Sequence, residues 1–174
     1  MTLNDPNKPV PGTPTGPLTQ SGVWVKGTLS LTASATDAGG GLAALRLLVD
    51  GNPQAGAGRQ TFACDFTFAV PCPASGSGSL SLNTTTLVDG THTVLVQAED
   101  AGGVTANKEN TASWPLLVDN HAPGSPTSLV LTDTPVAGSP VGFSWVNPDQ
   151  GVASPVETVK WQLLLRTVNR GRLW

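Results

Sequence analysis

The feature that most constrains the fold is the alternation of apolar and polar residues from Gly27 to Thr36. Leu29, Leu31, Ala33 and Ala35 alternate there with threonine and serine. Because successive side chains of a strand point to opposite faces, this period of two predicts a strand with one buried face. The period recurs at 45–49, 62–68, 80–82, 94–98 and 112–118, and no helical spacing extends over a comparable length. The sequence therefore predicts an all-β fold.

Turn-forming segments separate these predicted strands. Residues 37–40, 50–51, 71–78, 89–90 and 100–103 are rich in Gly, Asp and Pro, which favour chain reversal. With a first strand near Val23, strands at such spacing predict an antiparallel β-sandwich of about seven strands. Pro115 lacks a backbone donor and therefore predicts an edge position for the last strand.

Proline-rich segments mark the domain boundaries. Residues 120–126 predict a linker, and residues 1–8 have a similar texture, so one domain is expected at 9–119. The remainder, 127–174, predicts only three strands, near Leu129, Phe143 and Trp161, and therefore a partial second β-sandwich. Without an opposing sheet, its apolar face is expected to lack cover. Residues 166–174 show no clean alternation.

Two stretches of the first predicted domain carry a family resemblance. Residues 87–103, LVDGTHTVLVQAEDAGG, and residues 45–51 resemble bacterial immunoglobulin-like repeats. The segment VDNHAP at 118–123 resembles the joint that follows such repeats in secreted actinobacterial proteins. The resemblance implies an immunoglobulin-like sandwich in a protein that is extracellular or part of the cell envelope.

The second predicted domain resembles another family. Residues 141–148 and 154–161 resemble the first half of a fibronectin type III domain. The resemblance implies that Trp145 is its core tryptophan, while Trp161 stands where that family usually carries tyrosine.

Charge and hydropathy argue against nucleic-acid binding and against a membrane-spanning helix. A net charge of -3 provides no basic surface for a phosphate backbone, so nucleic acid is not an expected partner. No apolar run approaches the roughly 20 residues of a membrane-spanning helix. The first 17 residues lack the pattern of a signal peptide, which leaves two alternatives: a fragment of a longer protein or a cytoplasmic start.

Catalytic residues are not expected. The chain has two histidines, His92 and His121, and neither adjoins a nucleophile motif. His92 is expected to make a structural hydrogen bond with the turn at Asp89 and Gly90. Two cysteines and two distant histidines do not have the spacing of a zinc site.

Cys64 and Cys72 enclose a short segment, and a disulfide between them is the predicted arrangement. The alternative is two buried free thiols. An oxidising compartment agrees with the family resemblance.

Two candidate ligand sites follow from the pattern. Trp24 is the candidate ligand platform, because Trp114, Trp145 and Trp161 share the apolar phase of their strands. The loops after residues 36 and 98 lie at one end of a seven-strand sandwich.

This topology would bring Asp37 close to Glu99 and Asp100, and the incoming Asn4 and Asp5 add further oxygens. Such a group offers hard ligands for calcium, the one cofactor considered. The alternative is that Asp37 is an ordinary turn residue.

The sequence therefore favours a non-catalytic spacer, stalk or adhesion module whose partners are neighbouring domains of the same polypeptide. One alternative is a domain that binds a cell-surface glycan or protein through Trp24 or the loops. Another is an accessory domain of a secreted hydrolase.

Overall fold

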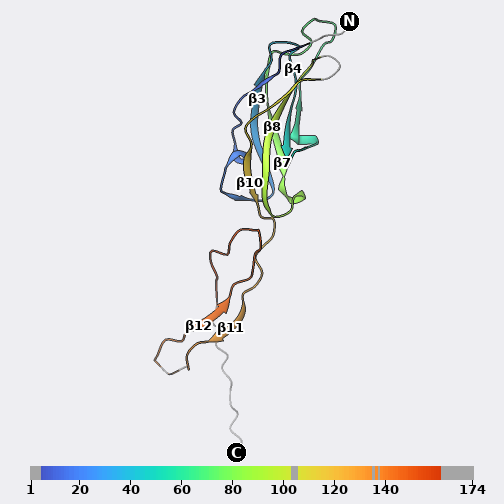
Figure 1. Cartoon of the computed structure of the whole chain (residues 1–174). Helices are drawn as coiled ribbons and strands as arrows, with labels where there is room; N and C mark the ends of the chain where they lie inside the picture. Colours follow the sequence, from blue (N-terminus) through green and yellow to red (C-terminus); the bar gives the residue numbers. More distant parts are fainter. Residues whose placement is uncertain (1–4, 103–105, 135, 137, 162–174) are drawn as a thin grey trace, which may run out of the picture. The chain divides into compact units, whose positions relative to one another are not determined.

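The computed structural model describes residues 5–102, 106–134, 136 and 138–161 (Figure 1). The chain divides into two compact units. The first comprises Met1–Ala122 and Val152–Ser154, and the second comprises Pro123–Gly151 and Pro155–Trp174. Within the described stretches, no helix is long and apolar enough to cross a membrane.

One sheet of the first unit contains β1 (Val10–Pro11), β3 (Thr28–Thr36) and β7 (Ser75–Asn83), in the order β1-β3-β7. The pairing of β3 with β7 is antiparallel and runs without a register shift over nine residue pairs. Leu31, Ala33 and Ala35 are buried, while the threonines and serines between them are exposed. The alternation at 27–36 therefore predicted this strand and its buried face correctly.

The other sheet has the order β2-β10-β8-β4-β5. Its strands are β2 (Trp24–Val25), β10 (Trp114–Val118), β8 (Gly90–Asp100), β4 (Leu42–Val49) and β5 (Asn52–Pro53). In addition, β6 (Arg59–Thr61) pairs with β4, and β9 (Lys108–Asn110) pairs with β8. All pairs are antiparallel except β2 with β10, which are parallel. Three short 3₁₀ turns complete the unit: η1 (Pro17–Thr19), η2 (Gly56–Gly58) and η3 (Thr84–Thr86).

The two sheets share one hydrophobic core, as a β-sandwich requires. Leu31 and Leu80 from one sheet belong to the same buried cluster as Leu45, Val96 and Leu116 from the other. Leu18 in η1 is fully buried in this cluster. The predicted all-β sandwich is confirmed.

The predicted strand at 62–68 is wrong. β6 ends at Thr61, residues 62–74 form no strand, and Phe66 and Phe68 are exposed. The chain reverses at Asp65, whose Oδ1 accepts from the backbone N–H of Thr67 at 3.0 Å.

The predicted turn at 71–78 is half wrong, because β7 begins at Ser75. Gly76 and Gly78 act as strand residues here. A Cβ atom at Gly76 would lie 2.5 Å from the Phe62 ring, and one at Gly78 would lie 2.6 Å from the Gln60 side chain. These glycines make room for neighbouring side chains instead of turning the chain.

β10 is not an edge strand, contrary to the prediction from Pro115. β2 pairs with it at Leu117 and Val118. Pro115 pairs only with Thr93 of β8 and lies beyond the reach of the two-residue β2. The sheet therefore tolerates the missing donor although another strand lies beside the end of β10.

The second unit contains β11 (Thr127–Leu131) and β12 (Phe143–Val146), which pair antiparallel. Residues 155–161 form no strand, and Leu163, Leu165 and the segment 166–174 lie outside the described residues. Trp145 and Trp161 are exposed, and the Trp161 ring lies 5.9 Å from that of Phe143. In the described part, these tryptophans therefore fill no core between two sheets.

Candidate functional site

Three buried carboxylates gather in the first unit: Asp5, Asp37 and Asp100. Asp5 precedes β1, Asp37 follows β3, and Asp100 is the last residue of β8. One oxygen atom of each lies within 4.8 Å of the others. The structure thus brings together Asp37, Asp100 and Asp5, three of the residues that the sequence placed at this end. We call this group the aspartate cluster.

Backbone amides hold each carboxylate in place. Asp37 Oδ2 accepts from the N–H groups of Gly39 and Gly41 at 3.0 and 2.8 Å. Asp100 Oδ1 accepts from Gly102 at 2.9 Å, and Asp5 Oδ2 accepts from the amide of Gly40. A Cβ atom at Gly39 would collide with the Asp5 carboxylate. The glycines after β3 therefore admit this side chain to the cluster.

Asn107 connects the amino-terminal segment to the end of β8. Its Nδ2 donates to the carbonyl oxygens of Asp5 and Asn7 at 2.8 and 3.0 Å, and to Asp100 Oδ2 at 2.8 Å. Sequence reasoning missed Asn107, because it lies in an irregular segment without periodicity. Asn4, which the sequence placed nearby, lies outside the described residues.

One oxygen of the cluster has no hydrogen-bond donor. Asp37 is only 4% exposed, and its Oδ1 is buried without a hydrogen-bond partner among the described residues. No lysine, arginine or histidine in the described part of the chain forms an ion pair with a cluster carboxylate. Among the described residues, hydrogen bonds from amide groups therefore hold the cluster carboxylates in place.

Glu99 does not join the aspartate cluster, contrary to the prediction. It is next to Asp100 in β8, and neighbouring side chains of a strand point to opposite faces. Glu99 Oε2 accepts from Arg46 Nε at 2.7 Å, and Oε1 lies 3.0 Å from Lys108 Nζ. Burial raises the pKa of Glu99, but the hydrogen bonds from Lys108 and Arg46 outweigh this effect and hold the pKa below its usual value.

His92 has structural partners on both ring nitrogens. Nδ1 lies 2.6 Å from Asp50 Oδ2 and Nε2 lies 2.8 Å from the Val88 carbonyl oxygen. The side chain therefore connects the β4–β5 turn to the segment before β8. The expected structural role is present, with Val88 and Asp50 as partners in place of the turn at Asp89 and Gly90. His121 is exposed and pairs with Asp89.

Cys64 and Cys72 form a disulfide, with their Cα atoms 4.3 Å apart. The bridge closes the loop between β6 and β7. Cys72 is buried, and its backbone N–H donates to the carbonyl of Gly40 at 3.1 Å. The loop is thereby attached to the segment that carries Asp37.

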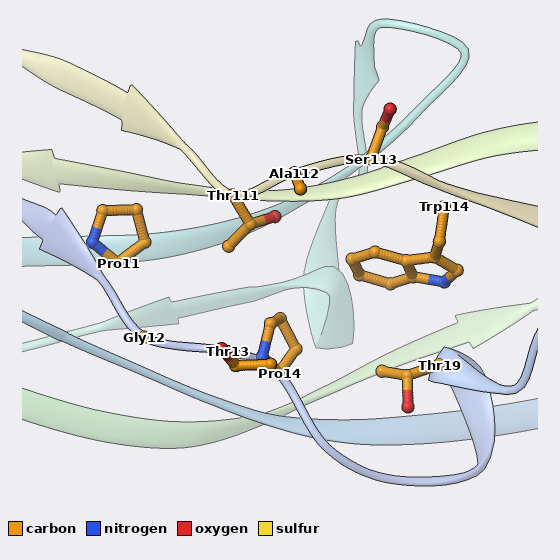
Figure 2. Close-up of a pocket in the computed structure, with 9 residues that line it drawn as sticks. All are labelled: Pro11, Gly12, Thr13, Pro14, Thr19, Thr111, Ala112, Ser113 and Trp114. Carbon is orange, nitrogen blue, oxygen red and sulfur yellow. The ribbon is translucent and has the colours of Figure 1, made fainter.

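A groove of about 380 Å³ lies beside Trp114 (Figure 2). The residues that line it are Pro11–Pro14, Thr19 and Thr111–Trp114. Trp114 is half-buried, and its Nε1 donates to the Leu18 carbonyl at 2.9 Å. Trp24 is half-buried in β2 and does not line this groove. No acidic, basic or thiol side chain is among the lining residues, so the groove has no acid–base pair.

The arrangement of two sheets, with β1, β3 and β7 packed on β2, β10, β8 and β4, is that of an immunoglobulin-like β-sandwich. Residues 13–96 match the family model described as a bacterial Ig domain. The first unit therefore combines an immunoglobulin-like β-sandwich with a match to the bacterial Ig domain family. No curated protein matches the sequence. The family match does not extend to the second unit, whose fibronectin type III character stays a prediction.

Proposed function

We propose that the chain is a spacer or stalk module of a larger secreted or cell-surface protein, and that it transmits tension between neighbouring domains. The family supports this role, because bacterial immunoglobulin-like domains are structural modules of longer proteins. The observation that carries the proposal is the parallel pairing of β2 with β10.

Parallel pairing of strands near opposite ends of a domain resists extension. β2 lies near the start of the first unit and β10 near its end. Trp24 pairs with Leu117, and the Asp119 N–H donates to the Val25 carbonyl at 3.0 Å. When the two ends are pulled apart, parallel strands slide along each other, so all of their hydrogen bonds must break together. A hairpin pulled from its open end would instead lose its bonds one by one.

Single-molecule pulling tests this proposal. The chain, placed between two marker domains, is expected to unfold in one high-force event. Val25→Pro removes a backbone donor from β2 and is expected to lower the unfolding force clearly. Val70→Pro is the matched control, because Val70 is exposed in the disulfide loop and lies outside the paired strands. Low-force unfolding of the unmodified chain, or equal forces for both variants, would contradict the proposal.

The groove beside Trp114 supports a second candidate function, the binding of a glycan or protein ligand. An indole bordered by threonine and serine hydroxyls offers stacking and hydrogen bonding together. Glycan-array binding that Ser113→Arg abolishes and Ala57→Arg retains would support it. Both positions are exposed, and only Ser113 lines the groove. Absence of binding, or equal loss in both variants, would leave the spacer role alone.

A further inference from the structure

We propose that the aspartate cluster is a calcium site that fixes the amino-terminal segment to the end of the sandwich. Asp5, Asp37 and Asp100 supply carboxylate oxygens from three separate parts of the chain, and all three are buried. Calcium prefers hard oxygen ligands and takes six to eight of them, so carboxylates and water together suit it.

The unpartnered oxygen points to a missing cation. Buried polar atoms are almost always hydrogen-bonded, and an unpaired carboxylate oxygen is costly to bury. Asp37 Oδ2 is already occupied by two amide donors, whereas Oδ1 has no donor among residues 5–102 and the other described stretches. An ion bound between the three carboxylates would satisfy this oxygen.

Mutual repulsion strengthens the argument. Three ionised carboxylates within 4.8 Å of one another repel strongly when water is excluded. Glu99, one residue away, shows how the same domain neutralises a buried acid with arginine and lysine. Within the described part, the aspartate cluster has no such cation, which distinguishes it from an ordinary ion-pair network.

Asp5 connects the proposed calcium site to the segment that enters the first unit. Its carboxylate enters the cluster from the segment before β1, and Asn107 holds the backbone of the same segment. Binding of calcium would therefore order the part of the chain that enters the domain. This would stiffen the joint with whatever precedes it, in addition to stabilising the sandwich.

Calorimetric titration of the full chain, freed of metal with a chelator, tests the site. Addition of calcium chloride is expected to give a saturable heat with one ion bound per chain, and to raise the Tm by several degrees at millimolar calcium. Absence of both responses would overturn the proposal, as would an equal response to magnesium chloride. The unmodified chain suffices for this test even if a variant fails to fold.

Asp37→Asn distinguishes a metal ligand from a structural side chain. In chelator, the variant is expected to be at least as stable as the unmodified chain, because one buried charge is removed. In calcium, it is expected to lose most of the Tm increase. Asp65→Asn is the matched control, since Asp65 is an exposed turn residue whose acceptor the amide keeps, and its calcium response should be unchanged. An equal loss of stability for Asp37→Asn with and without calcium would overturn the proposal.

Discussion

Buried ionisable side chains of the first unit are stabilised in three different ways. Glu99 is surrounded by cationic side chains, His92 lies between Asp50 and a carbonyl oxygen, and Asp37 relies on backbone amides. Each arrangement makes one polar residue specify the relative position of two or more strands or loops. Single substitutions at these places should therefore have effects that depend on pH, ions or neighbouring backbone.

His92 should make stability depend on pH. Burial lowers the pKa of His92, but the hydrogen bonds with Asp50 and Val88 outweigh this and raise its pKa above 6.5. A raised pKa contributes stability that is fully present below pH 6.5 and is lost as the pH rises through the folded value. The pKa of Asp50 is lowered, mainly by its hydrogen bond with His92, so its contribution is lost only as the pH falls toward 3.8 and below.

Thermal unfolding between pH 5 and pH 8 measures this effect. The unmodified chain should lose stability as the pH rises above 6.5, and His92→Gln should flatten that dependence. His121→Gln is the control, because it removes the other imidazole and keeps the contacts of His92 with Asp50 and Val88. A profile that His92→Gln does not change would show that the histidine is not the titrating group.

Gly41 and Gly51 allow a comparison of steric overlap with backbone strain. Both have positive φ, +85° and +77°, but a Cβ atom at Gly41 would collide with the Cys72 carbonyl, whereas one at Gly51 meets nothing within 4 Å. In urea unfolding, Gly51→Ala should cost roughly 1 kcal/mol from strain alone. Gly41→Ala should cost roughly 3 kcal/mol or more, because the backbone must also move. Equal costs would mean that the segment around Cys72 relaxes freely.

The residues of the aspartate cluster show what sequence can predict at this scale. Sandwich topology placed Asp37 near Asp100, because the loops that follow their two strands lie at the same end of the sandwich, although the strands belong to different sheets. The period of two, applied to residues 99 and 100, separates Glu99 from Asp100. Asn107 carried no such signal, since its role depends on the path of an irregular segment.

At the scale of elements, sequence predicted long strands well and short ones poorly. β3 and β8 have nine and eleven residues, enough for a clear alternation of burial. β1 and β2 have two residues each, too few to show a period. The alternation at 62–68 was misleading, because a disulfide and the turn at Asp65 shape a loop there instead of a strand.

The disulfide loop should contribute measurably to stability. Cys64 and Cys72 are eight positions apart, and closing so short a loop is expected to stabilise the fold by roughly 2.5 kcal/mol. Reduction with dithiothreitol should lower the urea midpoint accordingly. The Cys64→Ser, Cys72→Ser double variant should match the reduced chain and show no response to the reductant. A midpoint unaffected by reduction would show that the loop contributes little.

At the scale of the whole molecule, the two units differ in how completely they bury apolar surface. The first has one continuous core made by both sheets. The second has a single two-stranded sheet in its described part, and Leu129, Val130, Leu131 and Trp161 are all more than half exposed. Two strands alone are marginally stable in water, so we expect the second unit to require cover from further chain or from a partner.

Limited proteolysis should separate the two units. Proteinase K, which has broad specificity, is expected to digest the segment around the exposed Trp145 and Trp161 and to leave a resistant core that ends between Asp119 and Ala122. A chain truncated after Ala122 should then unfold cooperatively at nearly the same temperature as the full chain, since every strand of the sandwich is retained. This truncation also removes Val152–Ser154, which belong to the first unit. If truncation unfolds the sandwich, or if cleavage spares residues 125–161, the chain folds as one cooperative unit and the division into two is incorrect.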